Sequence, residues 1–151
     1  MPSVRPCHLL PICVNALIDH GSPLVLIDEQ LVSKLGLRIC ALPRAMPVTM
    51  AMSGEVKDPF LLMHYVQLSC LSLDEHFCSK SVRALLAPNL CTPLLLGAPF
   101  LSHKCIVIDH ELRTCIAKNN NYDLLHPPPI RSTMTPSQSN KDLKKCMSNY
   151  Q

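Results

Sequence analysis

Tryptophan is absent from this 151-residue chain, and aromatic residues make up only 4% of it. Hydrophobic residues of all kinds nevertheless reach 48%. The core must therefore be aliphatic, built from leucine, valine, isoleucine and methionine. A chain of this length suits one domain with a modest core and room for a tail.

Long hydrophobic runs and strong charge are missing as well. No apolar run approaches the roughly 20 residues that span a bilayer, so we expect no membrane contact and a soluble chain, or a soluble piece of a longer polypeptide. The net charge is only +3, and the basic residues are scattered until "KDLKKC" at 141–146. Binding to a nucleic-acid backbone requires a clustered basic face. We therefore expect no nucleic-acid partner for this domain and a solvated tail at 141–146.

The cysteines lack the features of a disulfide framework. There are nine of them, an odd number, with irregular spacing and no signal peptide before them. Cys13, Cys70, Cys105 and Cys115 lie in apolar runs, where a reduced thiol packs as a small hydrophobe. These observations predict an intracellular protein, cytoplasmic or nuclear, in a reducing compartment.

Metal-ligand spacing is also missing. The candidates are His103, Cys105 and His110, together with the pair Cys7-His8. None of them forms a C-x-x-C or a closely spaced His-His motif of the kind that binds zinc. We expect no metal and no cofactor.

Glycine is scarce, with four in the chain, all within the first hundred residues. The segments between them predict short Leu-rich or β-branched strands separated by turns. "DEQLVSKLG" at 28–36 predicts a short helix with Asp28 as its N-cap and Gly36 after its last turn. "APFLSHKC" at 98–105 predicts a second, with Pro99 in its first turn. "CIVIDHELRTCIAK" at 105–118 predicts two strands around a turn at 109–112.

The composition changes at Asn119, where asparagine, proline and serine become frequent and apolar periodicity ends. Such segments form linkers or disordered tails. We predict a lead-in at 1–8, one domain at 9–118 and a linker or tail at 119–151, with Leu124 and Leu125 as residues that could dock back.

The stretch "NALIDHGSPLVLI" at 15–27 places one carboxylate, Asp19, at the end of an apolar strand. Gly21 lets the chain turn sharply and lets its own N–H approach a neighbouring carboxylate. A charge among aliphatic groups is costly unless it is hydrogen-bonded or shares a proton. Two facing carboxylates cannot both ionise, so one acts as base and the other as acid. Such a pair can add water to a peptide carbonyl without a metal or a covalent intermediate.

Three features in this order resemble the retropepsin-like aspartic proteases, and most closely the protease domain of gypsy-type LTR retrotransposon polyproteins. They are "ALIDHG" followed by "SPLVLI", a glycine-tipped hairpin candidate at 53–54, and "TPLLLGAPFL" about 75 residues after the aspartate. The resemblance covers roughly residues 9–118. It implies a mostly β acid-protease half-barrel with one or two short helices, completed as a homodimer that cleaves extended peptide or polyprotein substrates.

The resemblance also implies roles for individual residues. Since the sequence holds one Asp-x-Gly motif, each copy in the homodimer would contribute one catalytic aspartate. The implied assignments are Asp19 as the catalytic residue; His20, Gly21 and Ser22 as the active-site turn; Met52, Ser53 and Gly54 as the flap tip that covers substrate; and Leu95, Leu96 and Gly97 as the second motif, whose strand runs beside the turn.

His20 departs from the family pattern, which has serine or threonine there with a hydroxyl that helps to lock the two turns together across the dimer. An imidazole is bulkier, and two protonated copies would repel. An alternative is therefore a catalytically inactive module for dimerisation or peptide binding. In a plainer interpretation, Asp19 only caps its turn by accepting the N–H of Gly21 or Ser22.

"VIDHE" at 107–111 echoes the Ile-Asp-His of the first turn. Its next residue is Glu111 where the first turn has glycine, so the tight turn loses backbone freedom. We interpret Asp109 as a strand-end or hairpin residue.

Overall fold

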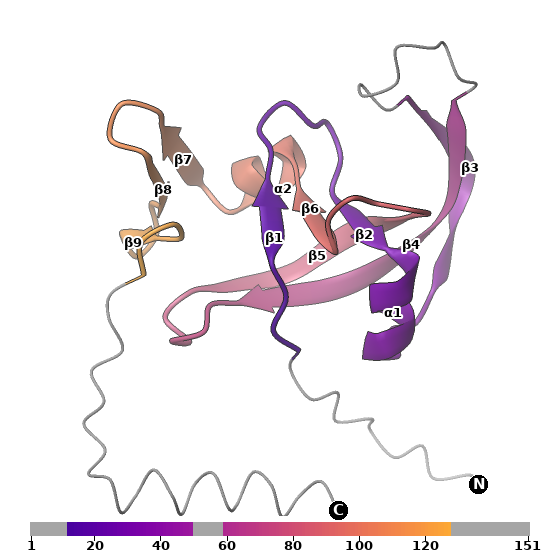
Figure 1. Ribbon diagram of the computed structural model, residues 1–151, viewed down its shortest axis with the longest axis horizontal. Coiled ribbons are helices and arrows are strands. Elements are labelled where there is room, and N and C mark those ends of the chain that lie inside the picture. The colour runs from indigo at the N-terminus through magenta and orange to yellow at the C-terminus, as the bar shows by residue number, and fades with distance from the viewer. Residues whose placement is uncertain (1–11, 50–58, 128–151) are drawn as a thin grey trace, which may run out of the picture.

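The computed structural model describes residues 12–49 and 59–127, and within these ranges the fold is mostly β with two short helices (Figure 1). The strands are β1 (Ala16–Ile18), β2 (Leu26–Asp28), β3 (Cys40–Val48), β4 (Phe60–Leu71), β5 (Cys78–Ala87), β6 (Leu94–Leu96), β7 (Ile106–Asp109), β8 (Thr114–Ala117) and β9 (Tyr122–Asp123). The helices are α1 (Glu29–Leu35) and α2 (Ala98–His103). Neither of these helices has the length and apolar character needed to cross a membrane.

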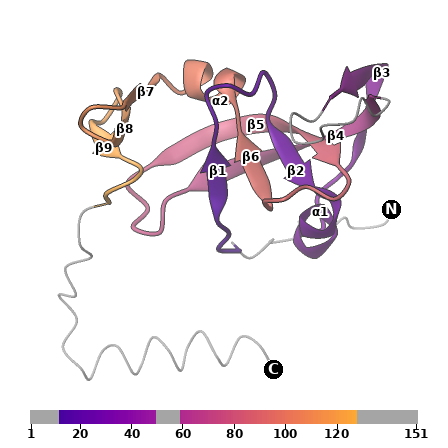
Figure 2. The same cartoon turned by 45° about the horizontal axis from the view of Figure 1, so that its top comes forward.

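Six strands form the larger sheet, in the order β1-β6-β2-β5-β4-β3. β6 therefore lies between β1 and β2, parallel to the first and antiparallel to the second (Figure 2). β7, β8 and β9 form a separate antiparallel sheet on the side of β1, and α2 connects β6 to it (Figures 1 and 2). This threading of β6 positions the candidate site.

The central strands β2 and β6 are apolar on both faces, because each contributes residues to two separate buried clusters. Along β2, Ile27 belongs to one core cluster and its neighbour Leu26 to another. The same alternation separates Leu95 from Leu94 and Leu96 in β6. Side chains of a strand point alternately to opposite faces, so the run "LLL" serves two aliphatic cores at once.

The predicted ends of α1 are confirmed. The carboxylate of Asp28 accepts the N–H of Gln30 at 3.1 Å, and Gly36 adopts the left-handed conformation (φ 60°) that closes a helix. Pro99 lies in the first turn of α2. β7 and β8 form the expected hairpin, with the Asp109 carboxylate accepting the N–H groups of Glu111 and Leu112, both at 2.9 Å.

The folded part continues past Asn119, where the sequence predicted a linker or tail. Tyr122 in β9 is 7% exposed, and its ring stacks on Phe77 with 6.3 Å between centroids. Leu124 packs against the core as well. The composition changes at 119, but the buried ring of Tyr122, the packing of Leu124 and the pairing of β9 with β8 hold this segment on the domain.

The expected packing of the cysteines is correct for only some of them. Cys115 is 1% exposed and Cys70 is half-buried, and burial raises the pKa of both thiols, so both remain protonated at neutral pH. Cys13 and Cys105 are exposed instead. Cys13 precedes β1, and Cys105 lies in the turn after α2 with a φ of 53°, so neither side chain enters the core.

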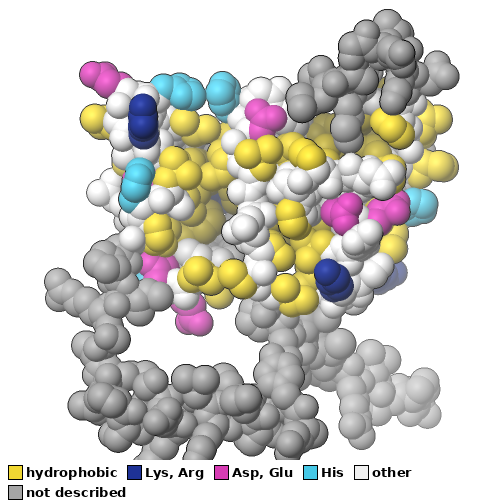
Figure 3. All heavy atoms as spheres, viewed as in Figure 1, with side chains coloured by type: hydrophobic (Ala, Val, Ile, Leu, Met, Phe, Trp, Pro, Cys, Tyr) yellow, Lys and Arg dark blue, Asp and Glu magenta, His cyan; other side chains and the backbone are white. Residues whose placement is uncertain are grey.

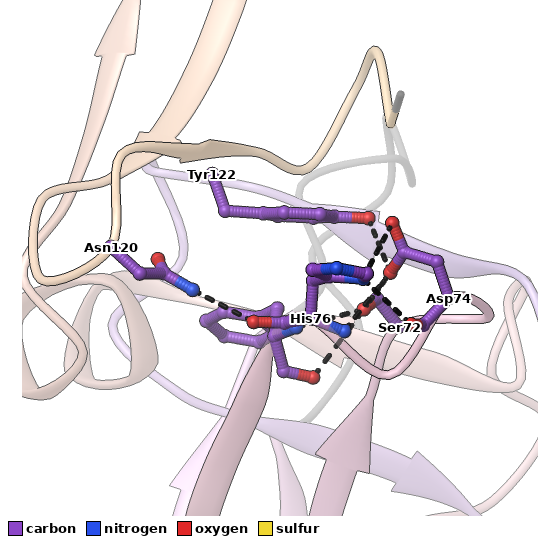
Figure 4. Close-up of polar contacts among 6 residues, drawn as sticks. Ser72, Asp74, His76, Asn120 and Tyr122 are labelled. Carbon is purple, nitrogen blue, oxygen red and sulfur yellow. Dashed lines mark hydrogen bonds and ion pairs between the residues drawn. The ribbon is translucent and has the colours of Figure 1, made fainter. Parts of the chain in front are cut away.

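A carboxylate fastens β9 to the β4–β5 hairpin (Figure 4). Oδ1 of Asp74 accepts hydrogen bonds from the hydroxyl of Ser72 at 2.6 Å, the phenol of Tyr122 at 3.0 Å and the backbone N–H of His76 at 3.2 Å. The bond from Ser72 is the main cause of a lowered pKa for the Asp74 carboxyl, against the opposing effect of burial. Asn120 adds a bond from its side-chain amide to the carbonyl of His76 at 2.8 Å.

The lowered pKa of Asp74 predicts a pH-dependent contribution to stability. A carboxyl whose pKa is lower in the folded state stabilises the fold above its unfolded pKa, about 3.9, and loses that effect as the pH falls through the folded value. Asp74→Ala should therefore lower the thermal midpoint at neutral pH, and the gap to the wild type should close near pH 2. Circular dichroism melts at both pH values measure this.

Tyr122→Phe is the matched control, because it keeps the ring on Phe77 and removes one donor to Asp74. Its midpoint should fall between those of the wild type and Asp74→Ala. An equal gap between wild type and Asp74→Ala at neutral and acid pH would contradict the role of the ionised carboxylate.

Candidate active site

Asp19 follows directly after β1, at the first position of a tight turn. Its Oδ1 accepts the N–H of Gly21 at 2.9 Å, and its backbone carbonyl accepts the N–H of Ser22 at 3.2 Å. The side chain is half-buried, and no donor bonds to Oδ2 among the residues that the structure describes. The bond to Gly21 is the one that the turn-capping interpretation predicted. It leaves the second oxygen free, so capping and chemistry are compatible.

Of the two roles predicted for Gly21, the structure shows the close approach of its N–H to a carboxylate. Its φ is outside the left-handed region, where Gly36 is the one glycine of the described ranges. A Cβ at position 21 would instead lie 3.2 Å from Oδ1 of Asp19, which is tighter than ordinary van der Waals contact. Glycine therefore serves the close approach of its N–H to the carboxylate.

Ser22 closes the turn locally. Its hydroxyl donates to the carbonyl of Leu24 at 3.0 Å and accepts the N–H of Leu24 at 3.3 Å. These bonds direct the chain out of the turn toward β2, as serine does in many turns.

Leu95, Leu96 and Gly97 lie against this turn, so the two predicted motifs meet. Leu96 of β6 is opposite Ile18 of β1, and the carbonyl of Leu96 accepts the N–H of Asp19 at 3.1 Å. Leu95 and Leu96 are buried. The backbone of each motif therefore fixes the other.

Gly97 passes beneath the turn with no room for a side chain. The N–H of the next residue, Ala98, donates to the carbonyl of Ser22 at 2.8 Å. A Cβ on Gly97 would lie 2.6 Å from that same carbonyl oxygen and closer still to the carbonyl of Leu24. Because these are backbone atoms, they cannot rotate away, and only glycine fits here.

His20 is exposed at the turn, and its ring meets another histidine. The centroids of His20 and His110 are 5.3 Å apart, with an angle of 66° between the ring planes. The two Ile-Asp-His segments, noted in the sequence as an echo, thus lie together in space. Beyond the repeated tripeptide, no pattern in the sequence predicts this contact.

Met52, Ser53 and Gly54, the predicted flap tip, lie outside the described residues. The strands that flank them, β3 and β4, are antiparallel neighbours with Val48 opposite Phe60.

As to metals, no three His, Cys, Asp or Glu side chains within 12–49 and 59–127 lie together as a candidate site.

Comparisons with known proteins find similarity among solved structures. No family model matches the chain, and no curated protein matches it. Among solved structures it is similar to the retroviral protease-like domain of Ddi1 from Leishmania major, with 14% identity, a TM-score of 0.41, and coverage of 81% of this chain and 88% of that one. With identity and TM-score this low, a function for the chain has to rest on the contacts of the Asp19 turn.

The fit of Gly97 beneath the turn predicts a large effect of one methyl group. Gly97→Ala should destabilise the fold by about 1–3 kcal/mol or more, the usual cost of overpacking, and displace the turn. Chemical denaturation measures the loss. Gly36→Ala is the control, since it adds the same methyl at a strained φ away from the site and should cost about 1 kcal/mol. A Gly97→Ala variant as stable as the wild type would contradict the contact.

Proposed function

We propose that this chain is one half of an aspartic endopeptidase of the retropepsin type, active as a homodimer on extended peptide or polyprotein substrates. The observation that carries the proposal is the half-buried carboxylate of Asp19, in a turn that is fixed by β6 and by Gly97 directly after it. A reaction at a peptide carbonyl requires a carboxylate held rigidly, and the two backbone bonds to β6 and α2 provide that rigidity.

The chemistry follows from two copies of Asp19. The single Asp-x-Gly motif of the chain requires a second copy, and two carboxylates close together share one proton. The ionised Asp19 takes a proton from water as the water attacks the peptide carbonyl, and the protonated Asp19 of the other copy gives its proton to the leaving amide nitrogen. The unbonded Oδ2 supports this role.

Exposed apolar residues support a partner surface. β1 is an edge of the larger sheet, paired with β6 alone among the described strands, and Leu17 on it is 46% exposed. On β4, Leu61 and Met63 are 63% and 57% exposed. Figure 3 shows hydrophobic side chains spread over one face of the molecule, with charged side chains and histidines in several places among them. A second copy, or a peptide bound as an added strand, would cover such surfaces.

The finer assignments extend the proposal. We infer an origin in a gypsy-type retrotransposon polyprotein, which would be the natural substrate, and a reducing intracellular compartment. Met52, Ser53 and Gly54 would close over bound peptide as a flap.

A second candidate function is an inactive module of the same fold for dimerisation or peptide binding. The observation in its favour is His20, whose ring contacts His110 of its own chain, where the family has a hydroxyl directed at the other copy. The two functions differ in turnover and share dimerisation.

Asp19→Asn separates the two functions. The amide keeps the shape of the side chain and the acceptor for Gly21, but it cannot act as a base. Turnover of a peptide library, followed by mass spectrometry, should fall by about 10²- to 10⁴-fold, and a statine-type inhibitor should block the wild type. Asp109→Asn makes the same change in the other Asp-His turn and should keep full turnover. A wild-type chain that dimerises without turnover from about pH 4 to about pH 8 would favour the module.

Acid pH should weaken the dimer if His20 lies at its two-fold axis, because protonated imidazoles in two copies repel. Sedimentation should show a lower dimer affinity near pH 4.5 than near pH 7, and His20→Thr should reduce the difference. Equal dimer affinity at both pH values would rule out His20 at the axis.

A further inference from the structure

His20 and His110 come from turns that are far apart in the sequence and built alike. Each histidine follows an aspartate whose Oδ1 accepts a backbone N–H of its own turn at 2.9 Å, from Gly21 in one and Glu111 in the other. The aspartates hold the backbone of each turn in one conformation. Both histidine side chains are exposed, so the core does not force the rings together.

The segment from Gly97 to Asp109 runs from beneath the Asp19 turn to the turn that carries His110, and hydrogen bonds hold both of its ends. α2 begins directly after Gly97, where Ala98 bonds to the carbonyl of Ser22. β7 follows α2 and ends at Asp109, and Leu112 adds a second bond to the carboxylate there. The scaffold that supports Asp19 therefore also sets the position of His110.

We propose that His110 is a positioning residue, whose ring holds the imidazole of His20 in one orientation beside Asp19. Its effect on catalysis rests on the proposed peptidase function, whereas the ring contact itself does not. The separation of 5.3 Å and the angle of 66° correspond to an edge-to-face pair, in which the positive edge of one ring meets the negative face of the other.

The contact restricts a side chain that would otherwise move. An exposed histidine samples several rotamers, and a ring packed against its side removes most of them. His20 is the immediate neighbour of Asp19, so a fixed ring also restrains the backbone of the turn. In this chain, a neighbour from the β7–β8 hairpin thus restrains the turn from within the same copy.

Two variants at position 110 test the proposal. His110→Ala removes the ring, and His110→Phe keeps a ring of similar width without nitrogen atoms. Leu112→Ala is the matched control, because it truncates a side chain that is 69% exposed on the same hairpin turn. The ring resonances of His20 are recorded by NMR in the wild type and all three variants, alongside kcat and KM for a cleaved peptide.

In His110→Ala, the ring protons of His20 should shift and lose their cross-peaks to residue 110, and kcat should fall about tenfold to a hundredfold, with KM little changed. His110→Phe should restore most of kcat and an aromatic shift on His20. Leu112→Ala should match the wild type in both measurements.

Three results would overturn the proposal: unchanged His20 resonances in His110→Ala, a full kcat despite the lost contact, or no rescue by phenylalanine. A wild-type chain without turnover would instead contradict the proposed function. The NMR comparison would then still decide whether His110 holds His20.

Discussion

The close approach of Gly97 to the carbonyls of Ser22 and Leu24 is the contact on which the candidate site depends. β6 lies between β1 and β2, and the chain that joins those two strands must pass over the end of β6. A side chain at position 97 would push the backbone of residues 22–24 away from the end of β6. With glycine there, the two backbones come close enough for Ala98 to bond to Ser22, and main-chain hydrogen bonds hold the turn that carries Asp19.

The aliphatic composition follows from the same arrangement. β1, β2 and β6 are only three residues long, so few ladder hydrogen bonds hold them. For β2 and β6, burial on both faces of the sheet adds stability, at little cost in side-chain entropy for leucine and isoleucine. Three of the few aromatic rings are buried in this core, where Phe77 packs with Phe100 and Tyr122.

The features that were predicted correctly from the sequence are those determined by residues close together along the chain. Asp28 and Gly36 cap the two ends of α1, and Asp109 bonds within its own hairpin. At these positions the residue type alone was sufficient to predict the local structure. The meeting of Asp19 with Gly97 was implied by family resemblance, since no local pattern contains it. The burial of Tyr122 and the pairing of His20 with His110 depend on long-range packing that composition and spacing do not encode.

The threading of β6 also sets an order of events during synthesis. β1 leaves the ribosome well before its partner strand β6 and Ala98, with most of the described domain between them. Pairings between such distant segments form slowly, since a long loop must close first. The turn that carries Asp19 therefore cannot reach its final geometry in a nascent or truncated chain. The final geometry of the Asp19 turn is thus delayed, by topology alone, until β6 and Ala98 are in place.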